Sequence, residues 1–280
     1  MGIFSSIVNE VLKQGLSFTS PQSFKNYLKK TDQNIKMTAP YISVDFLEKL
    51  DSELKENNLM VFRLGSPSGE SGTHFALAKS LNNWDDYFLD ERKIFHSTQI
   101  QEYELTGNLE KFITFKMLPK LTETSLVNLF FASGIMREAL KLDKNNDQII
   151  PSTCQSTFTF DFKPHIKLDA RWKHQNGQVE IDALFFGSRE NKKELYLIES
   201  KFGNNNTTLA KHKLAYPYLS LLQKIPQEYQ IIPIYLKTFL DSDMNIHFNI
   251  CECEFNSPTN SINELVPKTT SRFVIKNFFI

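Results

Sequence analysis

Two carboxylates and a lysine lie at the ends of two successive strand-like segments. Asp182 closes the run VEID, and Glu199 and Lys201 close the run LYLIESK. Because side chains alternate along a strand, Glu199 and Lys201 share one face of theirs, as Glu180 and Asp182 do of the other. If the two strands are neighbours, the carboxylates and the ammonium converge. Such a cluster is costly unless another charge compensates for it, and a hard divalent cation would do so.

The chemistry that this cluster predicts is metal-assisted attack of water on phosphorus. Magnesium takes oxygen ligands and binds through one or two carboxylates together with substrate phosphates. It would polarise a phosphoryl oxygen and orient hydroxide, while Lys201 holds the attacking water and offsets charge on the phosphorus. A bound cation would lower the pKa of Lys201 and the carboxylates would raise it, so both directions stay open at this point.

The spacing acid-x-lysine does not by itself identify a catalytic site, so the surrounding elements decide which pair is the candidate. It occurs at Glu53/Lys55, Glu91/Lys93, Asp161/Lys163, Glu190/Lys192 and Glu199/Lys201. Only the last pair follows a strand that carries an acid and precedes a helix with capping residues.

These residues resemble the signature of the PD-(D/E)xK nuclease superfamily, which includes most type II restriction endonucleases. There, an aspartate on the second core strand and an acid-x-lysine on the third bind magnesium and activate water. Asp182, Glu199 and Lys201 match residue by residue, although Ile181 replaces the proline. The resemblance covers roughly residues 124–255, including LAKHKLAYPYLSL, which is similar to the helix after the motif. It implies that Asp182, Glu199 and Lys201 are catalytic, and that Asp182, Glu199 and the backbone carbonyl of Ser200 bind Mg²⁺.

Two further acids are candidate ligands. Some nucleases of this superfamily add an acid from the first core helix, and Glu138 is the candidate by position. The alternative for Glu138 is an ordinary solvated helix acid. Glu180 would either join the metal site or point into solvent.

Four basic residues are candidates for DNA contact. Lys211, His212 and Lys213 open the helix after the motif, where positive charge would meet the DNA backbone. The alternative is a solvated helix face. Arg63 is a candidate for reading bases in the major groove, since only six of the 32 cations are arginines.

The order of segments predicts an α/β (α+β) fold with a restriction-endonuclease-like core, a mixed central sheet flanked by helices. Residues 124–142 are apolar on most sides and indicate a buried helix. Asn176-Gly177 between two strand-like runs predicts a hairpin. The remaining predicted elements are strands at 156–162, 194–202, 230–240 and 244–255, and a helix at 209–225 that Pro217 should kink. The order is helix, strand, strand, strand, helix, strand, strand, which we assign to a nuclease domain at 121–280.

Residues 1–120 are predicted to form a helical and mixed region that supplies DNA recognition, dimerisation or both. Helices are indicated after Ser20-Pro21 and at 44–56, and strands at 59–65 and 74–81. The Gly/Ser loop at 65–72 lacks the arrangement of a phosphate-binding loop, and a solvated turn is the favoured interpretation.

Composition narrows the class of protein. The chain has 280 residues, 41% of them apolar, with 32 basic and 32 acidic residues, which excludes a disordered or collagen-like chain. No apolar run is long enough to span a membrane, and the first residues lack a secretory signal. Three cysteines, Cys154, Cys251 and Cys253, suit free thiols in a reducing, cytoplasmic compartment. Residues 184–237 hold eight cations and four anions, so we expect positive charge confined to a cleft and weak binding to random DNA.

The main hypothesis is a magnesium-dependent DNA endonuclease, above all a type II restriction enzyme that cuts double-stranded DNA as a homodimer on a palindromic site. A repair or recombination nuclease of the same fold is an alternative. A non-catalytic DNA-binding module with structural acids is another, and so is an ordinary surface charge cluster.

Overall fold

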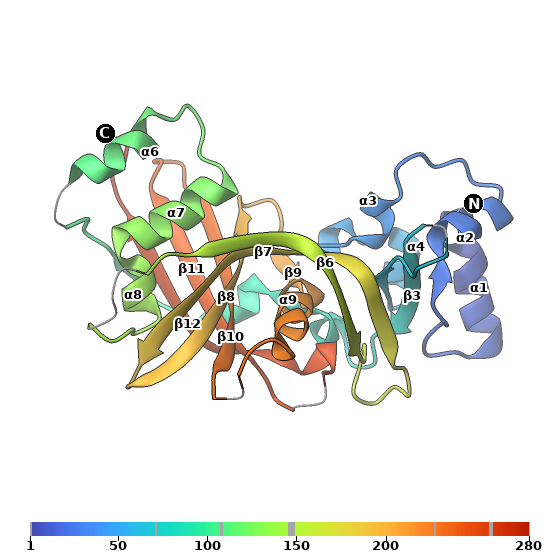
Figure 1. The fold of residues 1–280 in the computed structure, drawn as a ribbon. Coiled ribbons are helices and arrows are strands. Elements are labelled where there is room, and N and C mark those ends of the chain that lie inside the picture. The colour runs from blue at the N-terminus through green and yellow to red at the C-terminus, as the bar shows by residue number, and fades with distance from the viewer. Residues whose placement is uncertain are drawn as a thin grey trace.

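The computed structural model describes residues 2–70, 72–106, 109–144, 149–226, 228–257 and 260–279. Within these residues the chain forms a mixed α+β fold, with one large mixed sheet flanked by helices, as the sequence predicted (Figure 1). The strand order is β1-β3-β2-β7-β8-β10-β11-β12-β5, and β6 pairs with β7 off this path.

The centre of the sheet is built from residues 152–275. β6, β7 and β8 form an antiparallel meander, α9 crosses over, and β10 then lies parallel to β8. β11 and β12 extend the sheet antiparallel. The bounds are Ser152–Phe162 (β6), Trp172–Arg189 (β7), Lys192–Phe202 (β8), Thr208–Ala210 (β9), His212–Leu222 (α9), Gln230–Leu240 (β10), Ile246–Phe255 (β11) and Leu265–Ile275 (β12). The predicted order of three strands, a helix and two strands is present in β6, β7, β8, α9, β10 and β11, whereas the short β9 and the last strand β12 were not predicted.

Helices pack on both faces of this sheet. α7 (Glu123–Ser133) and α8 (Ile135–Ala139) lie on one face, where Leu126 and Phe130 join a buried cluster with Tyr196 and Ile198 of β8. α9 covers the other face, and its Leu214 packs in a second cluster with residues of β8 and β10. The helix predicted at 124–142 is interrupted at Gly134, whose φ of 93° is a left-handed conformation that glycine adopts readily.

The prediction of a hairpin at Asn176-Gly177 is wrong, because β7 continues through both residues. β6 pairs with β7 on both sides of this dipeptide, and a register shift between Phe158 and Phe160 absorbs the irregular backbone. Asn176 has a φ of 46°, and its N–H donates to Thr159 Oγ1 at 3.0 Å. Long-range pairing with β6 thus overrides the local preference for a turn, and the dipeptide forms a bulge.

The first 80 residues form helices over a three-stranded end of the sheet. The bounds are Ser5–Gln14 (α1), Gln22–Ser23 (β1), Phe24–Lys30 (α2), Ala39–Ile42 (α3), Ser52–Glu56 (α4), Leu59–Gly65 (β2) and His74–Lys79 (β3). The helix predicted at 44–56 is broken, because Leu50 is extended and Asp51 caps α4. One buried cluster joins this region to Phe162, Trp172 and Tyr216, so its core is continuous with that of β6, β7 and α9.

The segment from 84 to 120 is interwoven with later strands. β4 (Phe88–Asp90) pairs with β9, and β5 (Ile100–Glu102) pairs with β12. Four short helices complete it, the 3₁₀ turns Trp84–Asp86 and Leu109–Phe112 and the α-helices α5 (Glu91–Ile94) and α6 (Ile113–Met117). The sheet therefore includes residues on both sides of the expected boundary at 120.

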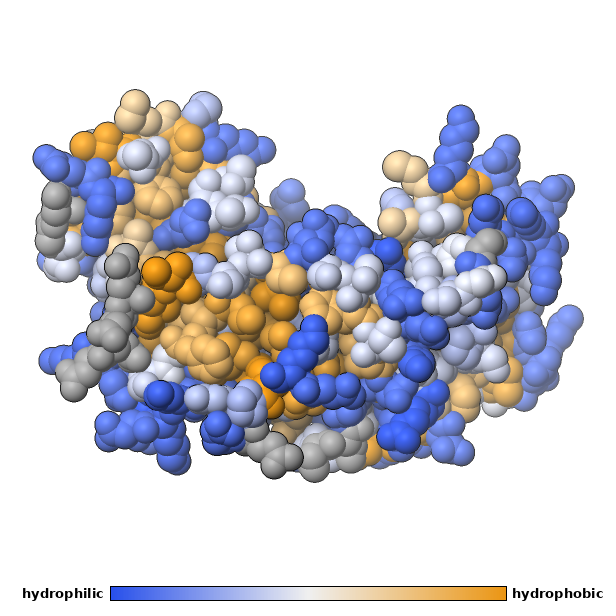
Figure 2. All heavy atoms as spheres, in the orientation of Figure 1, coloured by the Kyte–Doolittle hydropathy of each residue, from blue (hydrophilic) through white to orange (hydrophobic). Residues whose placement is uncertain are grey.

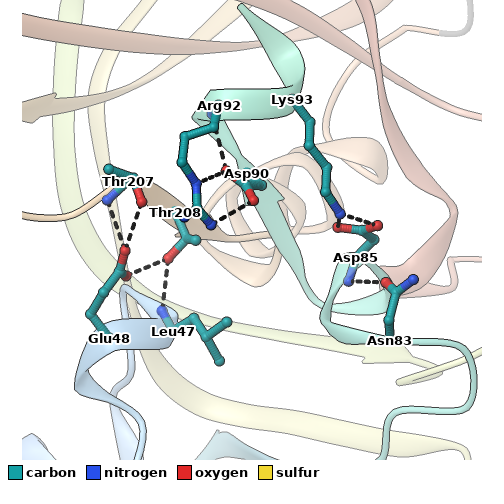
Figure 3. Close-up of polar contacts among 9 residues, drawn as sticks. All are labelled: Leu47, Glu48, Asn83, Asp85, Asp90, Arg92, Lys93, Thr207 and Thr208. Atoms are coloured by element: carbon teal, nitrogen blue, oxygen red, sulfur yellow. Dashed lines mark hydrogen bonds and ion pairs between the residues drawn. The ribbon is translucent and has the colours of Figure 1, made fainter. Parts of the chain in front are cut away.

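The loop after β8 is held by the N-terminal region. Glu48 accepts hydrogen bonds from the backbone and hydroxyl of Thr207 and from the hydroxyl of Thr208, at 2.6–3.0 Å (Figure 3). Thr208 in turn accepts from the N–H of Leu47. These contacts fix the path of the chain between β8 and α9.

No helix among the described residues is long and apolar enough to cross a membrane. All three cysteines are free thiols, with Cys251 and Cys253 buried and Cys154 half-buried.

Candidate functional site

Asp182 lies where β7 separates from β8. The two strands pair from Arg189 and Lys192 up to Ala183 and Ile198, and Asp182 is the next residue of β7. A register shift against β6 also places one extra β7 residue at this point, which is the pattern of a β-bulge. Asp182 Oδ2 accepts the N–H of Ser200 at 2.7 Å. The carboxylate thus binds a backbone group of β8 just beyond the paired residues and lies in the fork between the strands.

Lys201 lies at the centre of the candidate site. Its Nζ is 2.7 Å from Glu199 Oε1, 3.3 Å from Glu123 Oε1 and 2.8 Å from the carbonyl oxygen of Ser200. Burial acts to lower the pKa of Lys201, but Glu199, Glu123 and Asp182 together raise it above its ordinary value. Among the groups of the chain itself, the carboxylates therefore dominate, and Lys201 is a cation at neutral pH.

Glu199 is buried between two lysines. Its side chain is 3% exposed, and its Oε1 is also 3.7 Å from Nζ of Lys213, the second residue of α9. Burial raises the pKa of Glu199, and the charges of Lys213 and Lys201 oppose that rise. Lys213 is also 3.6 Å from Asp45 Oδ1. Of the basic residues predicted to open the helix, Lys213 is thus the one that reaches the site.

Glu123 is the acid that the sequence did not single out. It is the first residue of α7, after the N-cap Thr122, whose hydroxyl accepts the N–H of Ser125. Burial raises the pKa of Glu123 and, separately, that of Asp182. Glu123, Asp182 and the exposed Glu180 line one hollow of about 490 Å³. The predicted approach of Asp182, Glu199 and Lys201 is therefore present, and Glu123 completes it from a helix.

Glu138 lies elsewhere. It belongs to α8 and lines a different hollow together with Arg189 and Glu252. Arg189 is bonded to Glu194, at the other end of β8 from Glu199. The first core helices therefore supply Glu123 to Lys201, and Glu138 is not part of this site.

Lys211 and His212 are buried, which contradicts the solvated helix face that was the alternative for them. Lys211 Nζ donates to the carbonyl of Asn263 at 3.0 Å, and burial lowers its pKa to about 8. His212 packs against Phe62 and Tyr216, and burial lowers its pKa to about 3. Docking of α9 thus turns the first two residues of the run Lys-His-Lys inward.

The donor atoms at the site suit a hard cation. Glu123, Asp182 and Glu199 supply carboxylate oxygens, and burial raises the pKa of each, so a bound cation would relieve their repulsion. The Ser200 carbonyl accepts from Lys201 and has a second lone pair. Among the described residues, no three His, Cys, Asp or Glu side chains are already arranged to hold a metal ion. The site therefore fits Mg²⁺ in donor chemistry, and binding would require these side chains to move.

The site borders a broad saddle in the molecular surface. Figure 2 shows a hollow between two raised ends, with a largely hydrophilic floor. The end that carries α6 and α7 lies on one side and the N-terminal helices on the other, and β6 and β7 cross beneath (Figure 1). The hollow that Glu123 and Asp182 line is built from α7, β6 and β7, the same elements.

Comparison with known proteins gives one match. The model of a family described as Domain of unknown function (DUF6997) covers residues 90–274. That span includes Glu123, Asp182, Glu199, Lys201 and Lys213. No curated protein and no solved structure matches the chain.

Proposed function

Because this chain belongs to the family described as Domain of unknown function (DUF6997), we propose its function from the site itself. The proposed function is that of a magnesium-dependent endonuclease that hydrolyses phosphodiester bonds of double-stranded DNA, above all a type II restriction enzyme. The observation that carries the proposal is the convergence of Glu123, Asp182 and Glu199 around Lys201. Its position at the fork of an antiparallel pair, before a helix and a parallel strand, adds support.

The residues divide the work according to their charges. Asp182, Glu199 and the carbonyl of Ser200 would hold Mg²⁺, which supplies polarisation of a phosphoryl oxygen and neutralisation of charge. Before a cation binds, the carboxylates raise the pKa of Lys201 and hold it protonated. Its ammonium would orient the attacking water and stabilise negative charge on the phosphoryl oxygens.

The proton of the attacking water would then pass to a carboxylate or to solvent. Glu123 is the better-placed acceptor, since burial raises its pKa and its Oε1 lies 3.3 Å from Lys201 Nζ. Cleavage of both strands with one such site per chain calls for two copies related by a two-fold axis, so the partners in this proposal are a DNA duplex and a second copy.

The test is digestion of plasmid and phage DNA with purified protein and Mg²⁺. Lys201→Ala, Asp182→Ala and Glu199→Ala should abolish cleavage and leave DNA binding and folding intact. Lys192→Ala is the matched control, since Lys192 is exposed at the other end of β8 in a second acid-x-lysine pair. Full cutting by the Lys201 variant would refute the proposal.

The products separate the alternatives. Discrete fragments from phage DNA indicate a restriction enzyme, whereas a repair or recombination nuclease of the same fold would act on ends or branched structures and give none. Metal-dependent cleavage that is lost in Lys201→Ala excludes a non-catalytic DNA-binding module.

A further inference from the structure

A second, smaller hollow lies beside the candidate site and shares two of its residues. It has a volume of about 50 Å³ and is lined by residues of β2, β7 and α9, including Arg63, Glu180, His212 and Lys213. That volume holds a few water-sized atoms. Glu180 also lines the larger hollow next to Asp182, and Lys213 also contacts Glu199. The two hollows therefore adjoin at Glu180.

Arg63 is fixed by its backbone and left unpaired at its side chain. Its carbonyl accepts the hydroxyl of Tyr216 at 3.1 Å and contacts Nδ1 of His174 at 3.3 Å. Its Nε is buried without a hydrogen-bond partner. Within the described part of the chain, no carboxylate lies within ion-pair distance of its guanidinium, and burial lowers its pKa. A half-buried cation is thus held in place without an ion-pair partner among the described residues.

A charge in this position costs stability unless a ligand compensates for it. The surroundings favour an anion. Lys213, whose Nζ lies 3.6 Å from Asp45 and 3.7 Å from Glu199, adds a second cation to the lining. The acid in the lining, Glu180, is exposed at the rim.

We propose that this hollow is a subsite for one backbone phosphate of the bound DNA, next to the scissile phosphate. The inference rests on the proposed function, and it adds the path of the strand from the fork towards β2. A phosphodiester fits because its two free oxygens match the planar fork of a guanidinium. Its occupation would be independent of sequence, because phosphates carry no base identity.

The test compares Arg63→Met and Arg63→Lys in the inactive Lys201→Ala chain, with a DNA duplex as the probe. Arg63→Met should weaken binding roughly ten- to a hundredfold for every sequence. It should also reduce the slope of log K against log salt concentration by about one. Arg63→Lys should retain the slope and lose part of the affinity. Arg92→Met is the matched control, since Arg92 is exposed and already paired with Asp90.

Thermal unfolding separates this role from a structural one. If Arg63 is a ligand-binding residue, removal of its unpaired half-buried charge should leave the melting temperature of Arg63→Met unchanged or raise it. If Arg63 is structural, its removal would lower the melting temperature. A clear fall in melting temperature without a change in salt slope overturns the subsite.

A duplex with a single neutral methylphosphonate locates the contact. Moved along the strand, the substitution should weaken binding to the Arg63 chain at one position near the cut, and have no further effect at that position in Arg63→Met. Equal losses in both chains overturn the subsite while the nuclease proposal stands. Absence of DNA binding and cleavage by the unmodified chain refutes the nuclease proposal, and the subsite with it.

Discussion

Three acids surround Lys201, and their burial makes them destabilising as carboxylates. Burial raises the pKa of Glu123, Asp182 and Glu199. A carboxyl whose pKa is higher in the folded chain than in the unfolded one stabilises the fold at low pH. That contribution is lost as the pH rises through the folded-state value. At neutral pH the chain therefore holds charges that favour unfolding, as expected where a cation binds.

Asp182→Asn should raise the melting temperature at pH 7 by a few degrees, because it removes one half-buried charge and keeps an acceptor for the N–H of Ser200. The gain should vanish below about pH 3, where aspartate is protonated in both states. Millimolar Mg²⁺ should stabilise the parent chain and not the variant. Calorimetry across this pH range checks all three results, and a lower melting temperature at pH 7 would contradict the argument.

Glu123→Gln should slow cleavage roughly 10- to 100-fold, because Glu123 holds Lys201 and faces the same hollow as Asp182. Glu138→Gln is the matched control from the neighbouring helix and should cut at the parent rate. Single-turnover cleavage with saturating Mg²⁺ measures both. The reverse order of effects would show that the wrong acid has been assigned.

The site was partly readable from the sequence, and the limit is physical. Asp182, Glu199 and Lys201 could be predicted because local strand alternation places them. Glu123 could not, since its contact with Lys201 depends on how α7 docks on the sheet. The sequence also could not tell that Lys213 reaches the site while its two predecessors are buried, because the docking of α9 decides which side of its first turn is buried.

At the scale of elements, β7 organises the site. It is a strand of 18 residues that pairs with β6 along its first part and with β8 along its last. The bulge at Asn176-Gly177 allows this continuity, and it leaves no room for a side chain at Gly177. A Cβ there would lie 1.9 Å from the ring of His174. His174 also contacts the Arg63 carbonyl, so the bulge supports the second hollow.

Gly177→Ala should destabilise the chain by about 1–3 kcal/mol, because the methyl group would displace a buried imidazole. Gly187→Ala is the comparison on the same strand, since its Cβ would meet Tyr196 at 3.1 Å and Leu142 at 3.3 Å, a tight contact but well short of the overlap at Gly177. Neither glycine has a positive φ, so backbone strain does not differ. Urea unfolding measures both, and equal losses would contradict the packing argument.

Elements were predictable where periodicity alone decides. The strands at 59–65, 156–162, 194–202 and 230–240 have clear apolar patterns, and all are present. β12 lacks such a pattern because its middle, from Pro267 to Arg272, is polar and partly exposed. The Asn-Gly prediction failed because pairing with β6 is long-range.

At the scale of the molecule, the saddle shows why a zero net charge is compatible with local binding of DNA. Charge that averages to zero does not attract DNA from a distance, and local cations act only at close range. Lys201, Lys213 and Arg63 lie together by the fork between β7 and β8. These three cations are thus where we expect the predicted weak binding to random DNA to occur.

The proposed dimer predicts a nicking intermediate. An equal mixture of the parent and Lys201→Ala chains, refolded together, should contain dimers with one inactive site. These should convert supercoiled plasmid to the open circle and stall there, because each active site cuts one strand. Agarose gels follow the reaction. Linear product without accumulated open circle would show that one chain cuts both strands.

The continuity of β7 has a mechanical consequence. A single strand crosses from the part of the sheet under the N-terminal helices to the part under α7, and buried side chains pack along its whole length. If the proposed DNA complex forms, this continuous strand would resist a change in the width of the saddle. More of the adjustment would then fall on the DNA, and duplexes that bend easily would bind at the lowest cost in elastic energy. Part of the discrimination between sequences would therefore come from the stiffness of base-pair steps that no side chain touches.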